Sequence, residues 1–323
     1  MRKILVSGAS GVVGYGILRS LRGAGDYTLI GTTIYDKSVA PAFCDIFEKA
    51  PPTNSDGYIN WLTSIIKKHG IDMVIPGIED DMIKWNSQRA EITEVGTFPL
   101  LNNPDLIELC ADKWNFYQHL KALGSKFVIE SEIGSDFGKL KQSLGLPFLL
   151  KPRKGFGSKG ISIVETEEDF NLRRADIGDK LMAQMIVGTN DEEYTVSSFF
   201  DKSSKLLCYM QLKRKLAREG YTETAEVVEI EGIEVAINEL AALTKPVGPT
   251  NFQFRVRGGQ LKLLEINPRI SSATSIRSAF GYNESKISVE YFLERQTPTQ
   301  PVIRNGYAVR YVEEKIFYDS NNI

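Results

Sequence analysis

The residues best suited to hold a metal ion lie in the segment NFQFRVRGGQLKLLEINPR, at 251–269. Glu265 and Asn267 are two residues apart, so their side chains lie on one face if this part is a β-strand. A carboxylate and an amide oxygen are hard ligands of the kind that hold Mg²⁺ against substrate phosphates. Pro268 ends the strand, and Arg269 places a cation just beyond it. The segment therefore predicts a Mg²⁺ site beside an arginine.

The turn between the two strands of this segment decides which residue lies opposite Glu265. A two-residue turn at 258–259 would place Phe252 there, whereas a three-residue loop places Gln253 there. Register usually follows the buried face, and the longer loop gives one apolar face and one face with Gln253, Glu265 and Asn267. We therefore expect a bulged hairpin with a three-residue loop. The alternative is an amphipathic hairpin whose polar face meets water.

A glycine-rich segment, LLKPRKGFGSKG at 149–160, is the second candidate site. Lys151 ends an apolar strand, and another strand at 161–164 follows the glycines. Walker-type and Rossmann glycine loops are both followed by a helix, so neither applies here. Backbone N–H groups approach phosphate oxygens closely where no Cβ intervenes. The segment suits a flap over nucleotide phosphates, and a mobile surface hairpin is the alternative.

A third segment, LMAQMIVG at 181–188, could form one wall of an adenine site. Its strand is apolar, and Gln184 and the backbone could form hydrogen bonds to the base. Glu193, a few residues later, could accept hydrogen bonds from ribose hydroxyl groups. A plain core strand and a surface glutamate are the alternative.

The N-terminal glycines support a competing hypothesis. Gly8, Gly11 and Gly14 follow an apolar strand, and Asp36 ends the next strand. This spacing fits a dinucleotide-binding fingerprint, so a nicotinamide-dependent reductase is the competing function. That function leaves the glycine-rich segment and the metal-binding segment without a role.

Strands and helices alternate up to about residue 105, which predicts an α/β fold with a parallel, doubly wound sheet. A smaller α+β unit and then antiparallel strands should follow. Strands are expected at 126–131, 147–152, 161–164 and 180–187 in the smaller unit, and at 193–200, 205–211 and 307–312 beyond it.

Together these segments resemble the ATP-grasp superfamily, and in particular one ATP-binding half of the carbamoyl-phosphate synthase large subunit. The resemblance covers roughly residues 1–297 and is most specific in NFQFRV…LLEINPR and KPRKGFGSKG. It implies a Rossmann-like domain at 1–105, then a two-lobed α+β ATP-grasp domain. The lid lobe would occupy 106–183, and the C-terminal lobe with the metal site and the tail would occupy 184–323.

The resemblance also implies roles for single residues. The metal ligands correspond to Gln253, Glu265 and Asn267. The nucleotide-binding residues correspond to Lys113, Lys151, Gly157, Ser158, Gly160, Gln184, Met185, Ile186 and Glu193. The catalytic cations correspond to Lys151 and Arg269, and the acceptor-binding residues to Gly8, Ser10 and Gly11. Independently of the resemblance, Glu79 follows a parallel strand at the same carboxyl edge of the sheet and could orient the substrate. Glu79 has an alternative role as an acid at a helix N-terminus. Gln184 and Gln253 stand where the family has acidic residues, so the number of metal ions stays open.

The reaction that the resemblance implies is an ATP-dependent ligation. ATP would phosphorylate a small carboxylate to an acyl phosphate, and an amine or similar nucleophile would then displace phosphate. The cofactors would be ATP and Mg²⁺, or Mn²⁺ in its place. The chain is shorter than a complete carbamoyl-phosphate synthase, so we expect a stand-alone ligase, a homodimer or a subunit with a partner. A non-catalytic nucleotide-binding subunit is the third hypothesis.

The composition excludes several other classes of protein. The formal net charge is -2, so no global field attracts the chain to nucleic acid or to an anionic membrane. No apolar run is long enough to span a bilayer. Three widely spaced cysteines form no disulfide framework or zinc motif, and no signal peptide precedes the first strand. We therefore expect a cytoplasmic protein that acts on small molecules.

Overall fold

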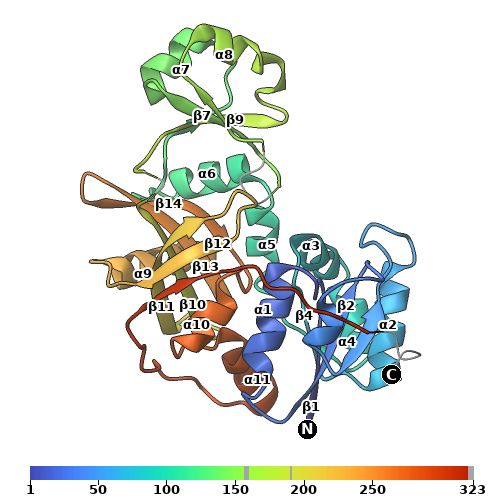
Figure 1. Ribbon diagram of the computed structural model, residues 1–323. Helices are drawn as coiled ribbons and strands as arrows, with labels where there is room; N and C mark the ends of the chain where they lie inside the picture. Colours follow the sequence, from blue (N-terminus) through green and yellow to red (C-terminus); the bar gives the residue numbers. More distant parts are fainter. Residues whose placement is uncertain (156–159, 190, 319–323) are drawn as a thin grey trace.

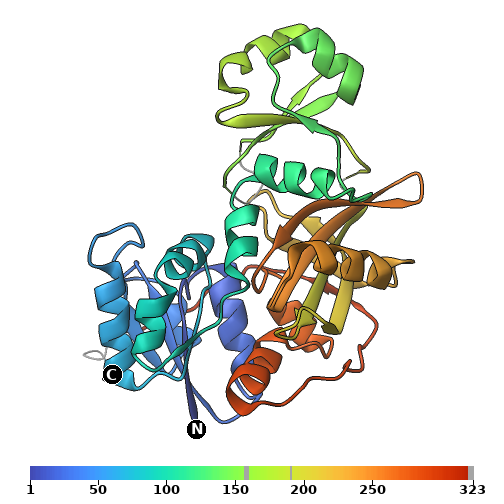
Figure 2. The same ribbon diagram turned by 180° about the vertical axis from the view of Figure 1, so that it is seen from behind.

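The computed structural model describes residues 1–155, 160–189 and 191–318. The strands among these residues form three β-sheets, of five, four and six strands. The four-stranded sheet stands apart from the other two, and helices α5 (Pro104–Cys110) and α6 (Lys113–Ala122) lie between the sheets (Figures 1 and 2). No helix in these residues is long and apolar enough to cross a membrane.

The N-terminal sheet is parallel, as the alternation of strands and helices predicts. Its strands are β1 (Arg2–Val6), β2 (Tyr27–Thr33), β3 (Ile46–Lys49), β4 (Met73–Ile75) and β5 (Phe98–Pro99), in the order β3-β2-β1-β4-β5. Its helical elements are α1 (Val12–Leu21), η1 (Ala40–Ala42), α2 (Tyr58–His69), α3 (Glu79–Ser87) and α4 (Arg89–Glu94). Two apolar clusters bury the strands: Leu5 and Val74 belong to one, and Ile4 and Met73 to the other.

Two glycines allow the segments that follow β1 and β4 to pack closely against each other. A Cβ at Gly14 would lie 2.2 Å from the carbonyl oxygen of Gly8, and a Cβ at Gly77 would lie 2.1 Å from that of Ser7. Both positions therefore require glycine. The turn before α1 and the turn before α3 meet at the carboxyl edge of the sheet, where ligands of such folds bind.

The four-stranded sheet has the order β6-β9-β7-β8. It contains β6 (Ser131–Glu132), β7 (Phe148–Pro152), β8 (Ser162–Val164) and β9 (Leu181–Met185), with α7 (Phe137–Leu144), α8 (Glu167–Asn171) and η2 (Arg174–Asp176). Phe148 and Phe170 lie in its own buried cluster. The strand expected at 126–131 is shorter than predicted, because residues 126–130 form no regular strand pairing there.

The six-stranded sheet is antiparallel, in the order β14-β13-β10-β11-β12-β15. Its strands are β10 (Glu193–Phe200), β11 (Leu206–Leu216), β12 (Thr222–Val227), β13 (Gly248–Arg257), β14 (Gln260–Asn267) and β15 (Tyr307–Val309). α9 (Ile233–Thr244) and α6 share a buried cluster with one face, and α10 (Thr274–Ala279) and α11 (Glu284–Glu294) share another with the opposite face. β15 is shorter than the strand expected at 307–312.

The β13–β14 hairpin corrects one prediction and agrees with another. The predicted three-residue loop is wrong, because Arg257 pairs with Gln260 and only two glycines form the turn. Both glycines have positive φ, 56° and 74°, which suits a two-residue turn. The extra residue lies within β14 instead, as a bulge at Leu264. Gln253 therefore still faces Glu265, as predicted, and the apolar residues of the hairpin still share one buried face.

Candidate active site

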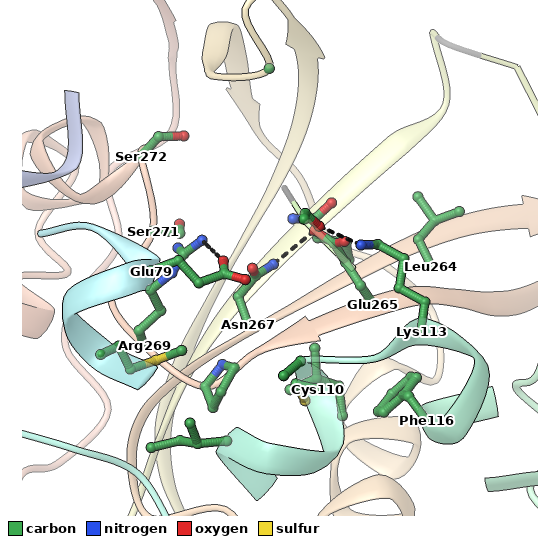
Figure 3. A pocket seen from close by; sticks show the side chains of 18 of the residues that line it. Glu79, Cys110, Lys113, Phe116, Leu264, Glu265, Asn267, Arg269, Ser271 and Ser272 are labelled. Atoms are coloured by element: carbon green, nitrogen blue, oxygen red, sulfur yellow. Dashed lines mark hydrogen bonds and ion pairs between the residues drawn. The ribbon is translucent and has the colours of Figure 1, made fainter. Parts of the chain in front are cut away.

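A cavity of about 400 Å³ lies between the N-terminal sheet, helices α5 and α6, and the β13–β14 hairpin. Residues from the first turns of α1 and α3 line one end, and residues from the four-stranded sheet line the other. Nine predicted site residues line it: Gly11, Glu79, Lys113, Lys151, Gln184, Gln253, Glu265, Asn267 and Arg269. The structure thus brings residues of the first turns of α1 and α3 together with residues of the other two sheets. Figure 3 shows Glu79, Lys113, Glu265, Asn267 and Arg269 around the cavity.

The predicted metal ligands lie side by side on the cavity face of the hairpin. Asn267 Nδ2 donates to Glu265 Oε1 over 2.9 Å, which leaves Asn267 Oδ1 as its acceptor atom. Burial raises the pKa of Glu265, but the hydrogen bond from Asn267 and the positive charges of Lys113 and Lys151 outweigh burial and hold this pKa below its usual range. The carboxylate is therefore ionised at neutral pH, as metal binding requires.

The chemistry of these ligands fits Mg²⁺ held jointly with phosphates. Gln253, Glu265 and Asn267 supply one carboxylate and two amide oxygens. In the part of the chain that the structure describes, no three Asp, Glu, His or Cys side chains gather as a metal site. Mg²⁺ usually keeps several waters and combines one or two carboxylates with substrate phosphates. The residues present therefore fit Mg²⁺ that arrives with a nucleotide.

Two lysines face the carboxylate from the other side. Lys151, at the end of β7, is only 8% exposed, and its Nζ donates to Gln184 Oε1 over 2.7 Å. Burial and the charge of Lys113 lower the pKa of Lys151 to about 8, although Glu265 opposes this shift. Lys113 begins α6, and its Nζ donates to the carbonyl oxygen of Gly155 in the glycine-rich segment. Two positive charges therefore lie beside Glu265, an arrangement that suits an anionic group such as a phosphate.

Arg269 and Glu79 lie on the other side of the predicted metal ligands. Arg269 Nη2 lies 3.1 Å from Glu79 Oε2, and both side chains are mostly buried. Glu79 is the first residue of α3, so this ion pair joins the N-terminal sheet to the end of β14. Figure 3 shows the two side chains pointing toward one another beside Asn267. A positive charge thus lies next to the predicted metal ligands, at the end of the cavity near the first turns of α1 and α3.

The opposite end of the cavity is largely apolar. Its walls there include Phe116, Leu120, Val128, Ile129 and Leu263. Gln184 is fixed among them, because its Nε2 donates to Ser131 Oγ over 2.9 Å while its Oε1 accepts from Lys151. An apolar slot with one oriented amide at its edge suits a planar base.

Other predicted site residues lie elsewhere. Gly8, Ser10, Gly160, Met185, Ile186 and Glu193 are described but do not line the cavity, and Gly157 and Ser158 lie outside the described residues. Ser10 Oγ is paired with Thr33 Oγ1 at 2.8 Å.

Glu193 differs most from its prediction. Its two carboxylate oxygens pair with Arg214 at 2.8 Å and with Arg255 at 3.1 Å. The cause is the register, which places Glu193 between these arginines on the neighbouring strands.

Arg214 lines the cavity, although it is not among the predicted site residues. It is buried, and its positive charge is one of those that lower the pKa of Glu265. The sequence pattern that could have identified Arg214 is the run Lys213-Arg214-Lys215. In a β-strand the middle residue of this run faces the opposite side from its two neighbours. Ser271 and Ser272, just after Arg269, also line the cavity.

Comparison with known proteins identifies the domain. Residues 182–315 match the family described as "ATP-grasp in the biosynthetic pathway with Ter operon". The carbamoyl phosphate synthase large chain of Methanosarcina mazei is 23% identical over 251 residues, which cover 71% of this chain and 23% of that one. The corresponding chain of Methanothrix thermoacetophila is 24% identical over 254 residues, with the same coverage. The chain thus spans about a quarter of the length of these relatives.

Solved structures share the fold over nearly the whole chain. N5-carboxyaminoimidazole synthetase from Staphylococcus aureus, complexed with ADP, has a TM-score of 0.75 and 16% identity, and the match covers 94% of this chain and 80% of that one. A biotin carboxylase–ATP complex from Campylobacter jejuni has a TM-score of 0.74 and 18% identity, covering 95% and 74%. From the family match and these relatives, the chain contains an ATP-grasp domain and is homologous to the large chain of carbamoyl phosphate synthase.

Proposed function

We propose that the chain is an ATP- and Mg²⁺-dependent ligase that phosphorylates a small carboxylate and joins it to an amine or a similar nucleophile. One observation carries this proposal. One cavity is lined by the hydrogen-bonded Glu265–Asn267 pair, with Lys113 and Lys151 on one side and Arg269 on the other. The cavity continues from the apolar slot to the carboxyl edge of the N-terminal sheet. A nucleotide and an acceptor could therefore meet at the metal.

The nucleotide would lie with its base in the apolar slot. Gln184 would contact adenine, and Lys113 and Lys151 would contact the phosphates. A backbone contact of Met185 and Ile186 with adenine has less support, because neither residue lines the cavity. Gly160 would lie beside the phosphates at the end of the glycine-rich segment, whereas the predictions for Gly157 and Ser158 lie outside the described residues. Gln253, Glu265 and Asn267 would hold Mg²⁺, or Mn²⁺ in its place, which neutralises charge on the phosphates. A ribose contact for Glu193 has less support, because two arginines already engage its carboxylate.

The reaction would proceed in two displacements. A carboxylate oxygen attacks the γ-phosphorus, and the bond to ADP breaks. The amine nitrogen then attacks the acyl carbon and loses a proton, while the bond from that carbon to the phosphate oxygen breaks. Arg269 would stabilise charge on the transferred phosphoryl group. Enclosure of the cavity would keep water from the acyl phosphate.

The acceptor would bind at the end of the cavity near α1 and α3. The N-terminus of α1 lines this end through Gly11 and Val12, and the structure shows no side-chain cap there. Free N–H groups at a helix N-terminus favour an anionic group such as a carboxylate or acyl phosphate. Glu79 lines the same end and would orient the nucleophile. Gly8 and Ser10 would shape the turn behind Gly11.

Several broader expectations remain part of this proposal. The units at 1–105, 106–183 and 184–323 would be a Rossmann-like domain, a lid lobe and a metal-binding lobe. The protein would act in the cytoplasm on small molecules, alone, as a homodimer or with a partner subunit. The competing reductase has little support, because Asp36, its expected ribose contact, is paired with Lys49 at 2.6 Å.

A screen of phosphate release tests the proposed function. The purified chain would be incubated with Mg-ATP and a panel of small carboxylates and amines, singly and in pairs, with Arg269→Ala as the control. We expect ADP and phosphate release only when an acceptable carboxylate is present, with full turnover when its amine is added. Mg-ATP binding without ADP release from any pair would instead indicate a nucleotide-binding subunit. Thermal stabilisation by NAD(P) but not by Mg-ATP would favour the reductase.

A further inference from the structure

The cavity face of the six-stranded sheet carries a row of polar residues beyond the predicted metal ligands. The register places Asn251 opposite Asn267, and Thr195 opposite Gln253. Because side chains alternate along each strand, Asn251 and Thr195 lie on the same face as the metal ligands. Both are completely buried. The metal-binding residues therefore have a second layer of polar neighbours on β10 and β13.

A fully buried arginine holds this second layer. Arg277, on α10, has no exposed surface, and its Nη2 donates to Asn251 Oδ1 over 2.6 Å and to Thr195 Oγ1 over 3.0 Å. Its Nη1 donates to Ser271 Oγ over 2.8 Å and pairs with Glu284 Oε1 at 2.9 Å. One guanidinium group therefore contacts the neighbour of Asn267 and the segment just after Arg269.

Stability alone does not account for this ion pair. Glu284, the first residue of α11, is also fully buried, and burying two charges costs about as much as or more than their attraction returns. Asn251 Nδ2 and Arg277 Nε have no hydrogen-bond partner among the described residues, and an unpaired buried donor destabilises the fold. The same helices already pack through apolar side chains such as Ile276 and Ile287.

We propose that Arg277, held by Glu284, is a positioning residue for the metal and phosphoryl-transfer site. It fixes the amide of Asn251 beside Asn267, and it fixes Ser271 two residues from Arg269. The metal ligands and the arginine therefore keep their spacing when the Mg²⁺–nucleotide complex enters. This inference rests on the proposed function, because it assigns the network to the same Mg²⁺ site.

A double substitution separates this role from stability. Arg277→Met with Glu284→Leu removes both charges together, and such apolar replacements of a buried pair are often neutral or stabilising. Ile287→Val is the matched control, since it trims the same helix pair without touching the network. ADP binding would be titrated by calorimetry at several Mg²⁺ concentrations, well below the melting temperature. Circular dichroism would confirm that each variant is folded.

We expect the double variant to need about ten times more Mg²⁺ for half-maximal ADP binding, since loss of outer partners of metal ligands typically costs about 10- to 100-fold. Ile287→Val should bind like the unaltered chain. If the double variant does not fold, the same Mg²⁺ titration is made with Arg277→Lys. One ammonium group cannot reproduce the forked contacts of the guanidinium with Asn251 and Ser271. The Mg²⁺ requirement of this variant should also rise about tenfold.

The outcomes distinguish this inference from the proposed function. Mg²⁺-dependent ADP binding that is normal in the unaltered chain and unchanged in a folded Arg277 variant would overturn the positioning role alone. Absence of Mg²⁺-dependent ADP binding in the unaltered chain would overturn both the positioning role and the proposed function.

Discussion

The proposed contact of Lys151 with nucleotide phosphates predicts that nucleotide binding depends on pH in a definite direction. Burial and the charge of Lys113 lower the pKa of Lys151 to about 8, so the ammonium loses its proton as the pH rises through 8. Nucleotide phosphates bind the ammonium form and not the neutral amine. Affinity for Mg-ADP should therefore be full below pH 8 and fall above it.

The size of the effect follows from that pKa. At pH 7 about nine-tenths of Lys151 would carry a charge, and at pH 9 about one-tenth would. If only the charged form binds, affinity falls about tenfold between these pH values, which is about 1.4 kcal/mol. Destabilisation of the folded chain by titration of Lys151 would not explain this loss of affinity. Between about pH 8 and the ordinary lysine pKa the unfolded chain binds more protons, so this group makes the free energy of unfolding rise with pH.

Calorimetry of Mg-ADP binding at pH 7, 8 and 9 measures the effect. Lys151→Arg is the control, because arginine stays charged throughout this range. We expect the affinity of the unaltered chain to fall about tenfold and that of the variant to change little. Constant affinity of the unaltered chain from pH 7 to 9, or an equal fall in the Lys151→Arg variant, would refute the role given to Lys151.

Three substitutions test other parts of the site. Arg269→Ala should lower kcat about 10²- to 10³-fold, as loss of one electrostatic donor does, and near-normal steady-state turnover would contradict its assignment. Glu265→Ala should abolish the Mg²⁺ dependence of nucleotide binding in calorimetry, and an unchanged dependence would argue against the metal site. Gly259→Ala should cost about 1–2 kcal/mol in urea unfolding, because its φ of 74° suits glycine, and unchanged stability would contradict the turn.

Burial explains why the register at the metal site was predictable from the sequence. Only one pairing buries Phe252 and Ile266 together, and that pairing places Gln253 opposite Glu265. The same reasoning could not decide where the extra residue lies. A three-residue loop and a bulge within β14 both satisfy the buried face near the site, and the pairing of Arg257 with Gln260 excludes the loop.

Contacts between segments that are distant in the sequence could not be predicted from local sequence patterns. Glu193 was expected to contact ribose, but pairing with strands on both sides places it between Arg214 and Arg255. The local sequence around Arg277 does not show that this residue is buried, because its burial comes from the packing of α10 and α11 on the cavity face. In both cases the packing of several strands and helices, rather than local pattern, decides what the charge contacts.

An isotope-transfer measurement tests the central claim, that a carboxylate is phosphorylated at this site. A carboxylate found in the screen would be labelled with ¹⁸O on both oxygens and turned over with Mg-ATP and the amine in ordinary water. The released phosphate would then be analysed by ³¹P NMR. The account predicts one ¹⁸O atom in each phosphate, because an oxygen of the carboxylate leaves with the phosphoryl group. Phosphate without the label would contradict it, since its oxygen would then come from water.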